Sequence, residues 1–335
     1  MIYNTVFVTG GAGYCGSVLV PRLLKLGYRV TVYDIGWFGI NFLPINNKNL
    51  SVVKGDIRDI ERVEKYCRGH DVFLHLACIS NDASFELDRA LSTSINYDAF
   101  EPMVIAAKNG GISRFVYASS SSVYGVSDEP QVTETHPLVP LTLYNEYKGK
   151  CEPLLFDHTN SDFVGVVFRP ATVCGYAPRL RLDLSVNILT HHAITKNKIT
   201  VFGGEQLRPN LHIKDYCRTV ELLLSAPSEL LANEIFNVGR DNFSIMEIAQ
   251  IVKHVVEENF LSQGAIDITT TPSDDMRSYH INSDKIKTTL GFSPLFSIED
   301  AVYELCTAFT AGLISDSFEN NNYYNVKRLK QLGVK

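Results

Sequence analysis

The sequence lacks the features of a secreted, membrane-spanning or nucleic-acid-binding protein. Its 335 residues contain no apolar run of about 18 residues that could cross a bilayer. The first residues carry no cationic stretch followed by an apolar one, so we expect no signal peptide. The net charge is −6, which excludes a general attraction to nucleic acid or to an anionic membrane. We therefore predict a cytoplasmic protein without nucleic-acid or membrane partners, in which local arginine or lysine side chains hold any anionic ligand.

Paired cysteines are missing as well. The 7 cysteines are odd in number and include no Cys-x-x-Cys pair, which argues against a disulfide framework and favours reduced thiols. The adjacent His191 and His192 would point to different faces of a helix, and no set of cysteines or carboxylates surrounds them in the sequence. We therefore predict no metal site, and we expect these histidines on a solvated face or in a capping role.

What the sequence does contain is an alternation of short apolar runs with longer amphipathic segments over its first half. A hydrophobic content of 45% is enough for a large core. Several runs are apolar on both faces, as in strands covered by helices, and their alternation with helices predicts an α/β fold with a doubly wound parallel sheet of the Rossmann type. We expect strands at 5–9, 29–34, 51–54, 71–76, 114–118 and 163–168, and helices at 14–26, 59–67, 85–109 and 143–159.

After about residue 175 this alternation ends, and we expect a smaller second lobe. A loop rich in arginine and proline leads to predicted helices near 184–196, 214–225 and 244–258 and to a short strand at 234–238. We predict a first domain over residues 1–170, to which some later segments return, and an α/β substrate lobe over residues 171–335. The cleft between two such parts is the natural place for a ligand.

The strongest motif is a glycine-rich turn, Thr9–Gly16, between an apolar strand and an amphipathic helix. In a dinucleotide site Gly10 would make the tight turn, Gly13 would let the backbone approach a pyrophosphate, and Gly16 would let the helix pack against the strand. The helix N-terminus would then offer free N–H groups to the phosphates. The second strand ends at Asp34, whose carboxylate would bind ribose hydroxyls and repel a 2′-phosphate. The pattern therefore predicts that the first domain binds NAD rather than NADP.

A second motif places Tyr144 and Lys148 four residues apart, on one face of a predicted helix. A free tyrosine has a pKa of about 10, and a nearby ammonium group and a cationic nicotinamide would both favour the tyrosinate. The hydroxyl run Ser119–Ser122 lies upstream, and one of its serines would hydrogen-bond the substrate oxygen. The motif predicts a group of side chains for proton transfer, but the run itself leaves open which serine takes part.

With these residues the chain resembles the extended short-chain dehydrogenase/reductases, the NAD-dependent epimerases and dehydratases of nucleotide sugars that include UDP-galactose 4-epimerase. The resemblance implies a Rossmann domain with a smaller substrate lobe, NAD as cofactor and a nucleotide-diphosphate sugar as substrate. It rests on motifs that recur in the same order: Thr9–Gly16, Gly55-Asp56-Ile57, His75-Leu76-Ala77, Asn96, Ser119–Gly125, Tyr144–Lys148 with Glu152, Arg169-Pro170, Arg208–Ile213 and Phe236–Gly239.

The resemblance also implies roles for single residues. Tyr144 would be the acid/base, Lys148 would lower its pKa and contact the nicotinamide ribose, and Ser120 is selected as the catalytic serine by its place before Tyr124-Gly125. Arg208 and Arg277 would bind the substrate diphosphate. Further cofactor contacts are implied for Tyr14, Cys15, Asp56, Ile57, Leu76, Ala77, Cys78 and Asn96, and further substrate contacts for Ser120, Ser122, Thr172 and Asn187. Asn96 could equally make a helix-packing hydrogen bond.

The chain departs from the family pattern in several places. The dehydratase branch has an Asp-Glu pair after its catalytic threonine, whereas this chain has Ser121-Ser122, so 4,6-dehydratase activity is not expected. Thr172 stands where epimerases have a ligand-contacting asparagine. Arg179 and Arg181 lie in a segment that resembles nucleotide-heptose 4-dehydrogenases; they could clamp a diphosphate, or they could form a surface pair bridged to Asp183.

The resemblance implies an enzyme that acts at sugar C4 through a transient 4-keto intermediate, in the synthesis of sugars for cell-surface polysaccharides. Return of the hydride to the other face would make it an epimerase, whereas release of the ketone would make it a 4-dehydrogenase and the reverse reaction a 4-ketoreductase. A non-catalytic NAD-binding sensor is the alternative from another class. Because such family members dimerise through a four-helix bundle, we expect a homodimer whose shared face includes Phe100, Met103, Val104, Leu154 and Leu155.

Overall fold

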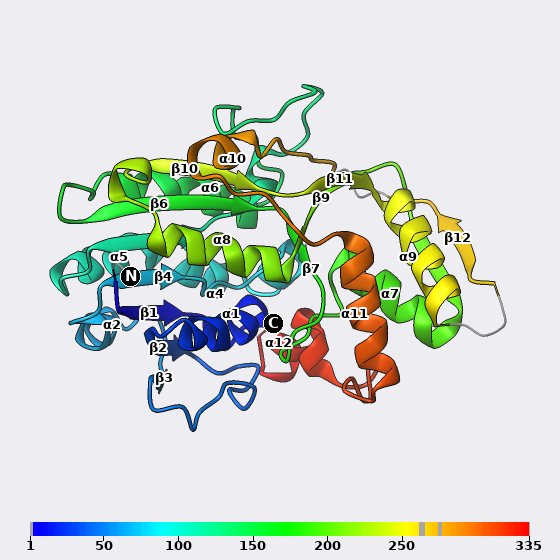
Figure 1. Cartoon of the computed structure of the whole chain (residues 1–335), viewed down its shortest axis with the longest axis horizontal. Helices are drawn as coiled ribbons and strands as arrows, with labels where there is room; N and C mark the ends of the chain where they lie inside the picture. Colours follow the sequence, from blue (N-terminus) through cyan, green and yellow to red (C-terminus); the bar gives the residue numbers. More distant parts are fainter. Residues whose placement is uncertain (1–2, 261–264, 274–276, 335) are drawn as a thin grey trace.

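A parallel sheet of seven strands forms the centre of the chain in the computed structural model, which describes residues 3–260, 265–273 and 277–334 (Figure 1). Its strand order is β10-β6-β5-β4-β1-β2-β3, and every neighbouring pair is parallel. This order confirms the doubly wound Rossmann-type fold. The strands are β1 (Thr5–Thr9), β2 (Arg29–Asp34), β3 (Leu50–Lys54), β4 (Val72–His75), β5 (Arg114–Ala118), β6 (Val164–Pro170) and β10 (Glu234–Val238).

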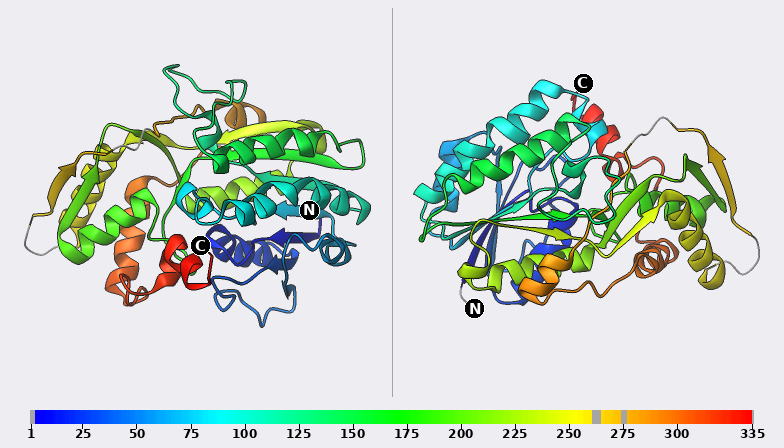
Figure 2. Two further views of the ribbon diagram at one scale, coloured as in Figure 1. Left: turned by 180° about the vertical axis from the view of Figure 1, so that it is seen from behind. Right: turned by 90° about the horizontal axis from the view of Figure 1, so that it is seen from above.

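Helices cover both faces of this sheet, as the view from above in Figure 2 shows. Along β1, Val6 and Val8 pack into the core under one set of helices, while Phe7 packs into the core under the other. The first face is covered by α1 (Tyr14–Lys25) and α8 (Ile213–Ser225), and the second by α2 (Ile60–Cys67), α5 (Phe100–Asn109) and α6 (Leu143–Phe156). Burial on both sides explains why these strands are continuous apolar runs in the sequence.

The second lobe adjoins the carboxyl ends of the central strands (Figures 1 and 2). It holds a sheet of three strands in the order β11-β9-β7 and a pair β12-β8. The strands are β7 (Thr172–Cys174), β8 (Lys198–Phe202), β9 (Leu207–His212), β11 (Asp241–Ser244) and β12 (Asp267–Thr271), and the helices packed around them are α7 (Ser185–Lys196), α9 (Ile245–Asn259) and α11 (Ile298–Thr310). Later segments also return to the first domain: β10 pairs with β6, and α10 (Asp284–Leu290) packs against β10.

The predicted helix over residues 85–109 is broken in the structure. It consists of α3 (Asp82–Phe85), α4 (Arg89–Thr93), a π-helical turn (Ser94–Asp98) and α5. Asp88 interrupts the helix because its side chain caps α4 by accepting a hydrogen bond from the Leu91 N–H. The other helices agree with the prediction to within a few residues. Short 3₁₀ turns at Ser121–Tyr124, Ser228–Leu230 and Asn321–Tyr323, and α12 (Asn325–Gln331), complete the chain.

Several predicted positions have a different environment. Phe100, Met103, Val104 and Leu155 are fully buried in the core of their own chain, so the prediction that they lie on a shared dimer face was wrong; of that set only Leu154 is partly exposed. They face inward because α5 and α6 cover the central sheet. In the described ranges, no helix is long and apolar enough to cross a membrane.

The histidine pair also differs from the prediction. His191 is not solvated: it is fully buried, its Nε2 lies 2.8 Å from the Ser317 Oγ, and its ring stacks on Phe309. The other histidine, His192, lies among the residues that line the central cavity. Among the residues that the structure describes, no group of three or more His, Cys, Asp or Glu side chains could hold a metal ion.

Candidate active site

The glycine-rich turn between β1 and α1 has no room for side chains. Gly10 adopts a φ of +72°, and a Cβ atom on it would lie 2.6 Å from the Ala77 backbone. A Cβ atom on Gly16 would lie 2.3 Å from the Gly11 carbonyl oxygen, so only glycine lets α1 pack this closely. Helix α1 begins after Gly13 without a side-chain cap, which leaves its first N–H groups available to an anion. This cradle fits the diphosphate of a dinucleotide.

Asp34, at the end of β2, is anchored by the same turn. Its carboxylate accepts hydrogen bonds from the Ala12 N–H at 2.9 Å and from the Gly36 N–H at 2.8 Å. Burial raises the pKa of this carboxyl, and the two N–H donors oppose that rise. The residue therefore stands where an acid can bind ribose hydroxyls beside the glycine turn.

One cavity of about 610 Å³ joins this turn to the predicted catalytic residues. It lies at the carboxyl ends of the central strands, and residues of the second lobe such as Arg208 also line it. The predicted cofactor residues that line it are Gly10, Gly13, Tyr14, Cys15, Gly16, Asp34, Asp56, Ile57, Leu76, Ala77, Cys78, Tyr144 and Lys148. Asn96 does not line it. Its side-chain amide bonds the N–H and the carbonyl of Ile79, so it supports the segment after β4 instead of meeting the cofactor.

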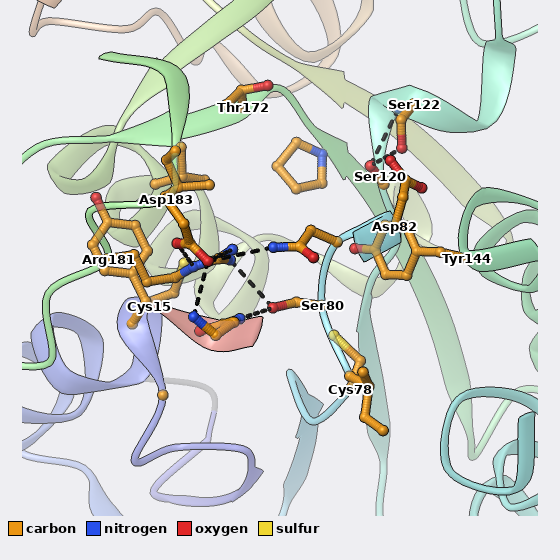
Figure 3. Close-up of a pocket in the computed structure, with 18 of the residues that line it drawn as sticks. Cys15, Cys78, Ser80, Asp82, Ser120, Ser122, Tyr144, Thr172, Arg181 and Asp183 are labelled. Atoms are coloured by element: carbon orange, nitrogen blue, oxygen red, sulfur yellow. Dashed lines mark hydrogen bonds and ion pairs between the residues drawn. The ribbon is translucent and has the colours of Figure 1, made fainter. Parts of the chain in front are cut away.

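The predicted catalytic side chains come from α6 and from the turn after β5. Thr142 caps α6, and Tyr144 and Lys148 follow one helical turn apart. The Lys148 ammonium group is buried and donates a hydrogen bond of 2.7 Å to the Ala118 carbonyl oxygen. Ser120 and Ser122 lie on the same side of the cavity as Tyr144 (Figure 3), and their two hydroxyl oxygens are 2.7 Å apart. The structure thus brings the predicted Ser–Tyr–Lys group together.

A buried ion pair holds the serine turn against α6. Arg169 and Glu152 are each about 3% exposed in their side chains and lie 2.5 Å apart. Glu152 also accepts a hydrogen bond from the Ser119 hydroxyl at 2.6 Å, and Arg169 donates one to the Tyr124 hydroxyl at 2.6 Å. Because these bonds lie at both ends of the serine turn, they fix the position of Ser120 relative to the helix that carries Tyr144.

Electrostatics at Tyr144 differ from the expectation in the absence of cofactor. Burial raises the pKa of the Tyr144 hydroxyl well above its ordinary value, and the neighbouring Cys78 and Asp82 raise it further. The cation that opposes this rise is Arg181 from the second lobe. The phenol is therefore neutral in the free protein, and formation of the tyrosinate needs additional positive charge in the cavity.

Arg208 and Arg277 meet at the other end of the cavity. Arg208 donates a hydrogen bond to the Arg277 carbonyl oxygen, and its guanidinium carbon lies 5.3 Å from the centre of the Tyr279 ring. Arg277 forms an ion pair with Asp82, which follows β4 in the first domain. Thr172 lies beside this group, with its hydroxyl 3.4 Å from that of Tyr279. The two predicted arginines thus lie together, and Asp82 connects them to the surroundings of Tyr144.

Of the remaining predicted substrate residues, Arg179 and Arg181 line the cavity and Asn187 does not. Arg181 is buried and paired with Asp183 at 2.8 Å, which favours the bridged alternative, but the pair lies inside the cavity and not on the surface. Arg179 lies at the cofactor end, above the ring of Phe38. Asn187 is fully buried and does not line the cavity: its amide bonds the Gly175 N–H and the Arg181 carbonyl, so direct substrate contact was a wrong prediction.

Other residues of the cavity were not predicted, because distant segments bring them there. Asp82, Asp183, Tyr279 and Asn325 line it although no motif marks them. The sequence offers one sign of the turn that carries Asp82, namely the asparagine before it. Asn81 has a φ of +71°, and asparagine is among the residues that tolerate this conformation.

Comparison with known proteins identifies the family. The model of the NAD dependent epimerase/dehydratase family matches residues 6–239. A dTDP-glucose 4,6-dehydratase from Streptomyces niveus is 29% identical over 329 residues, which cover 89% of this chain and 90% of that protein. UDP-glucuronic acid decarboxylase 1 from Arabidopsis thaliana is 28% identical over 327 residues, 93% of this chain and 71% of that protein.

Solved structures of nucleotide-sugar enzymes have a similar fold. The crystal structure of a UDP-glucose 4-epimerase with UDP-glucose from Thermotoga maritima matches with a TM-score of 0.81 at 24% identity, over 92% of this chain and 100% of that chain. The chain belongs to the NAD dependent epimerase/dehydratase family; it is an enzyme of nucleotide-sugar chemistry, and its cofactor is NAD.

Proposed function

We propose that this enzyme epimerises a nucleotide-diphosphate sugar at C4 through a transient 4-keto intermediate. The observation that carries the proposal is that Ser121 and Ser122, directly after Ser120, stand where the dehydratase branch has its Asp-Glu pair. Ser120 and Ser122 lie within hydrogen-bond distance of each other and line the cavity together with Tyr144. These side chains serve proton transfer at one sugar oxygen. They do not supply an acid and a base for the elimination of water.

The mechanism follows from what each side chain can do at the C4 oxygen. Bound NAD supplies the acceptor for the C4 hydride and its later donor. Tyr144 accepts the proton of the C4 hydroxyl during oxidation and returns it during reduction. Ser120 hydrogen-bonds the same oxygen and keeps it aligned with the tyrosine. Lys148, held by the Ala118 carbonyl, adds positive charge that favours the tyrosinate.

Epimerisation requires that the 4-keto sugar rotates, so that its other face meets the cofactor before reduction, while its diphosphate stays bound. Arg208 and Arg277 supply the cationic anchor for that diphosphate at the far end of the cavity. The ion pair of Arg277 with Asp82 gives way when the diphosphate arrives, because a carboxylate and a phosphate compete for one guanidinium group. The sugar end near Tyr144 carries small hydroxyl side chains, Ser120, Ser122 and Thr172, which leave room for rotation.

Asp82 is the exception to this hydroxyl lining. It contributes negative charge at Tyr144 and is held by Arg277 and by the Thr142 hydroxyl at 2.5 Å. A carboxylate in this place disfavours a sugar that itself carries a carboxylate, since like charges repel in a cavity of low dielectric. We therefore favour a neutral sugar over a uronic acid, and epimerisation over decarboxylation.

The test is product analysis with a panel of UDP-, GDP-, CDP- and dTDP-sugars, each with and without added NAD. A C4 epimerase gives a product of unchanged mass, identified by NMR, and no accumulation of NADH. Loss of water would identify a dehydratase and loss of carbon dioxide a decarboxylase, and either would overturn the proposal. A product two hydrogens poorer with stoichiometric NADH would identify a 4-dehydrogenase, and NADH-dependent reduction of a 4-keto sugar would identify a 4-ketoreductase. NAD binding without turnover of any sugar would favour a sensor.

A further inference from the structure

Arg179 occupies an unusual place for a charged residue. It belongs to the loop between β7 and α7, yet its backbone N–H donates a hydrogen bond of 3.2 Å to the Ser17 hydroxyl in the first turn of α1. The residue is only 3% exposed and lines the cavity together with Gly13 and Asp34. The second lobe thus places an arginine at the helix end that receives the cofactor.

The guanidinium group of Arg179 is only partly satisfied. Its carbon lies 3.8 Å from the centre of the Phe38 ring, and its Nη2 donates a hydrogen bond of 2.6 Å to the Asn325 Oδ1. Its Nε and Nη1 are buried without a hydrogen-bond partner. Within the described residues no carboxylate forms an ion pair with it, and burial lowers the pKa of Arg179 to about 9. A buried cation with two unused donors is costly unless an anion binds it.

Its neighbour Arg181, in the same cavity, is paired with a carboxylate and serves as a comparison. Arg181 donates to both carboxylate oxygens of Asp183, at 2.8 and 3.2 Å, and a third bond goes to the Ser80 hydroxyl. Its charge is therefore balanced within the protein. Arg179 differs because an amide, Asn325, takes the place that a carboxylate would take.

We propose that Arg179 binds the diphosphate of the dinucleotide cofactor, not that of the sugar substrate. The phosphates would then lie between the open N–H groups of α1 and the unused Nε and Nη1 donors of Arg179. A guanidinium group that is already stacked on Phe38 loses little further side-chain freedom on binding. This assignment does not depend on which reaction takes place at the sugar.

Helix α12 makes the C-terminal segment part of this site. Asn325, at its start, bonds Arg179 through Oδ1 and the Ser80 hydroxyl through Nδ2 at 2.9 Å, and its N–H bonds the Asp183 carboxylate at 3.0 Å. One turn later, the Arg328 Nε donates a hydrogen bond of 2.7 Å to the carbonyl of Trp37, next to Phe38. Asn325 is thus a positioning residue that aims Arg179 without cancelling its charge.

The first variant is Arg179→Gln, assayed on the full chain by isothermal titration calorimetry with NAD, ADP-ribose, adenosine and UDP. We expect the dissociation constants of NAD and ADP-ribose to rise roughly 10- to 150-fold, the range for loss of a hydrogen bond to a charged group. The affinities for adenosine and UDP should stay unchanged, because neither carries the cofactor diphosphate. Weaker UDP binding with unchanged NAD binding would overturn the proposal and return Arg179 to the substrate site.

Two further variants guard against a merely structural effect. Arg114→Gln is the matched control: Arg114 is also fully buried, stacks on Tyr3 and has an unused Nε, but it lies outside the cavity. It should lower the melting temperature without changing NAD affinity. Asn325→Asp would place a carboxylate on Arg179, so NAD and ADP-ribose should bind more weakly while the fold stays stable. Unchanged cofactor affinity in Asn325→Asp would overturn the proposal even if Arg179→Gln did not fold.

Discussion

The two ends of the cavity are built in different ways. At the cofactor end a backbone cradle, formed by the glycine turn and the open start of α1, lies beside side chains such as Arg179 and Phe38. At the substrate end they are long side chains that reach across from opposite parts of the fold, such as Asp82 and Arg277. A backbone cradle can change only if the strands and helices move, whereas side-chain contacts can be exchanged one at a time. From this contrast we expect cofactor binding to depend on the fold and sugar binding to depend on side chains that can be replaced.

Tyr144→Phe should separate chemistry from binding at both ends. The phenylalanine keeps the ring and removes the proton acceptor, so kcat should fall by about 10²- to 10⁴-fold. The NAD content of the purified protein and the KM for the nucleotide sugar should remain near the wild-type values.

Tyr147→Phe is the control for this experiment, because Tyr147 lies on the same helix but packs against Tyr97 and Phe85. It should keep most of the activity. A Tyr144→Phe variant with more than about a tenth of the wild-type rate would contradict the acid/base role, since such groups usually contribute at least 10²-fold.

Arg208→Ala should affect the substrate end alone. Loss of a charge-assisted contact should cost about 1.5–3 kcal/mol, visible as a raised KM because the contact persists from the ground state to the transition state. Arg240→Ala serves as control, since Arg240 is half-exposed and pairs with its neighbour Asp241. If Arg208→Ala left the affinity for the free nucleoside diphosphate unchanged, the proposed anchor would be wrong.

Asp34→Ala should affect the cofactor end alone, and more mildly. The variant loses the ribose contact and the repulsion of a 2′-phosphate, so NAD should bind roughly tenfold more weakly, a loss of about 1.4 kcal/mol, and NADP relatively better. Titration with both cofactors measures this change, and the exposed helix cap Asp59→Ala controls for removal of a carboxylate. A wild-type enzyme that preferred NADP would contradict the role of Asp34.

The smallest effect on catalysis is expected from the outer face of α5, which belongs to neither end. Ile105 is 40% exposed there, while its neighbours on the helix fill the core. We predict a homodimer through this face, so Ile105→Glu should give a monomer in sedimentation velocity with near-normal kcat. Leu26→Glu, 49% exposed after α1 on the opposite face of the sheet, should leave the dimer intact. A wild-type protein that is monomeric at micromolar concentration would refute the prediction.

The same contrast explains how far the sequence could predict the structure. The glycine turn, Asp34 and the Tyr144–Lys148 pair lie in short stretches of chain whose local spacing already dictates their geometry. Asp82, Tyr279 and Asn325 enter the cavity through tertiary packing, which local spacing does not encode. Asn187 was predicted as a substrate contact from the family resemblance, yet packing of α7 turned its amide inward to Gly175. The break before α5 was missed because the helical apolar pattern continues across the π-helical turn.

The wall that α12 adds to the cavity affects the residence time of the cofactor as well as its affinity. Asn325 and Leu329 line the cavity, and the bonds of α12 to Asp183 and Trp37 hold this wall in place. An epimerase restores its cofactor to the starting oxidation state within each turnover, so a long residence time of NAD does not slow it. A net dehydrogenase must exchange its cofactor in every turnover, and opening of this wall would limit its kcat. The fold of the C-terminal segment therefore suits an enzyme that keeps its cofactor and recycles it in place.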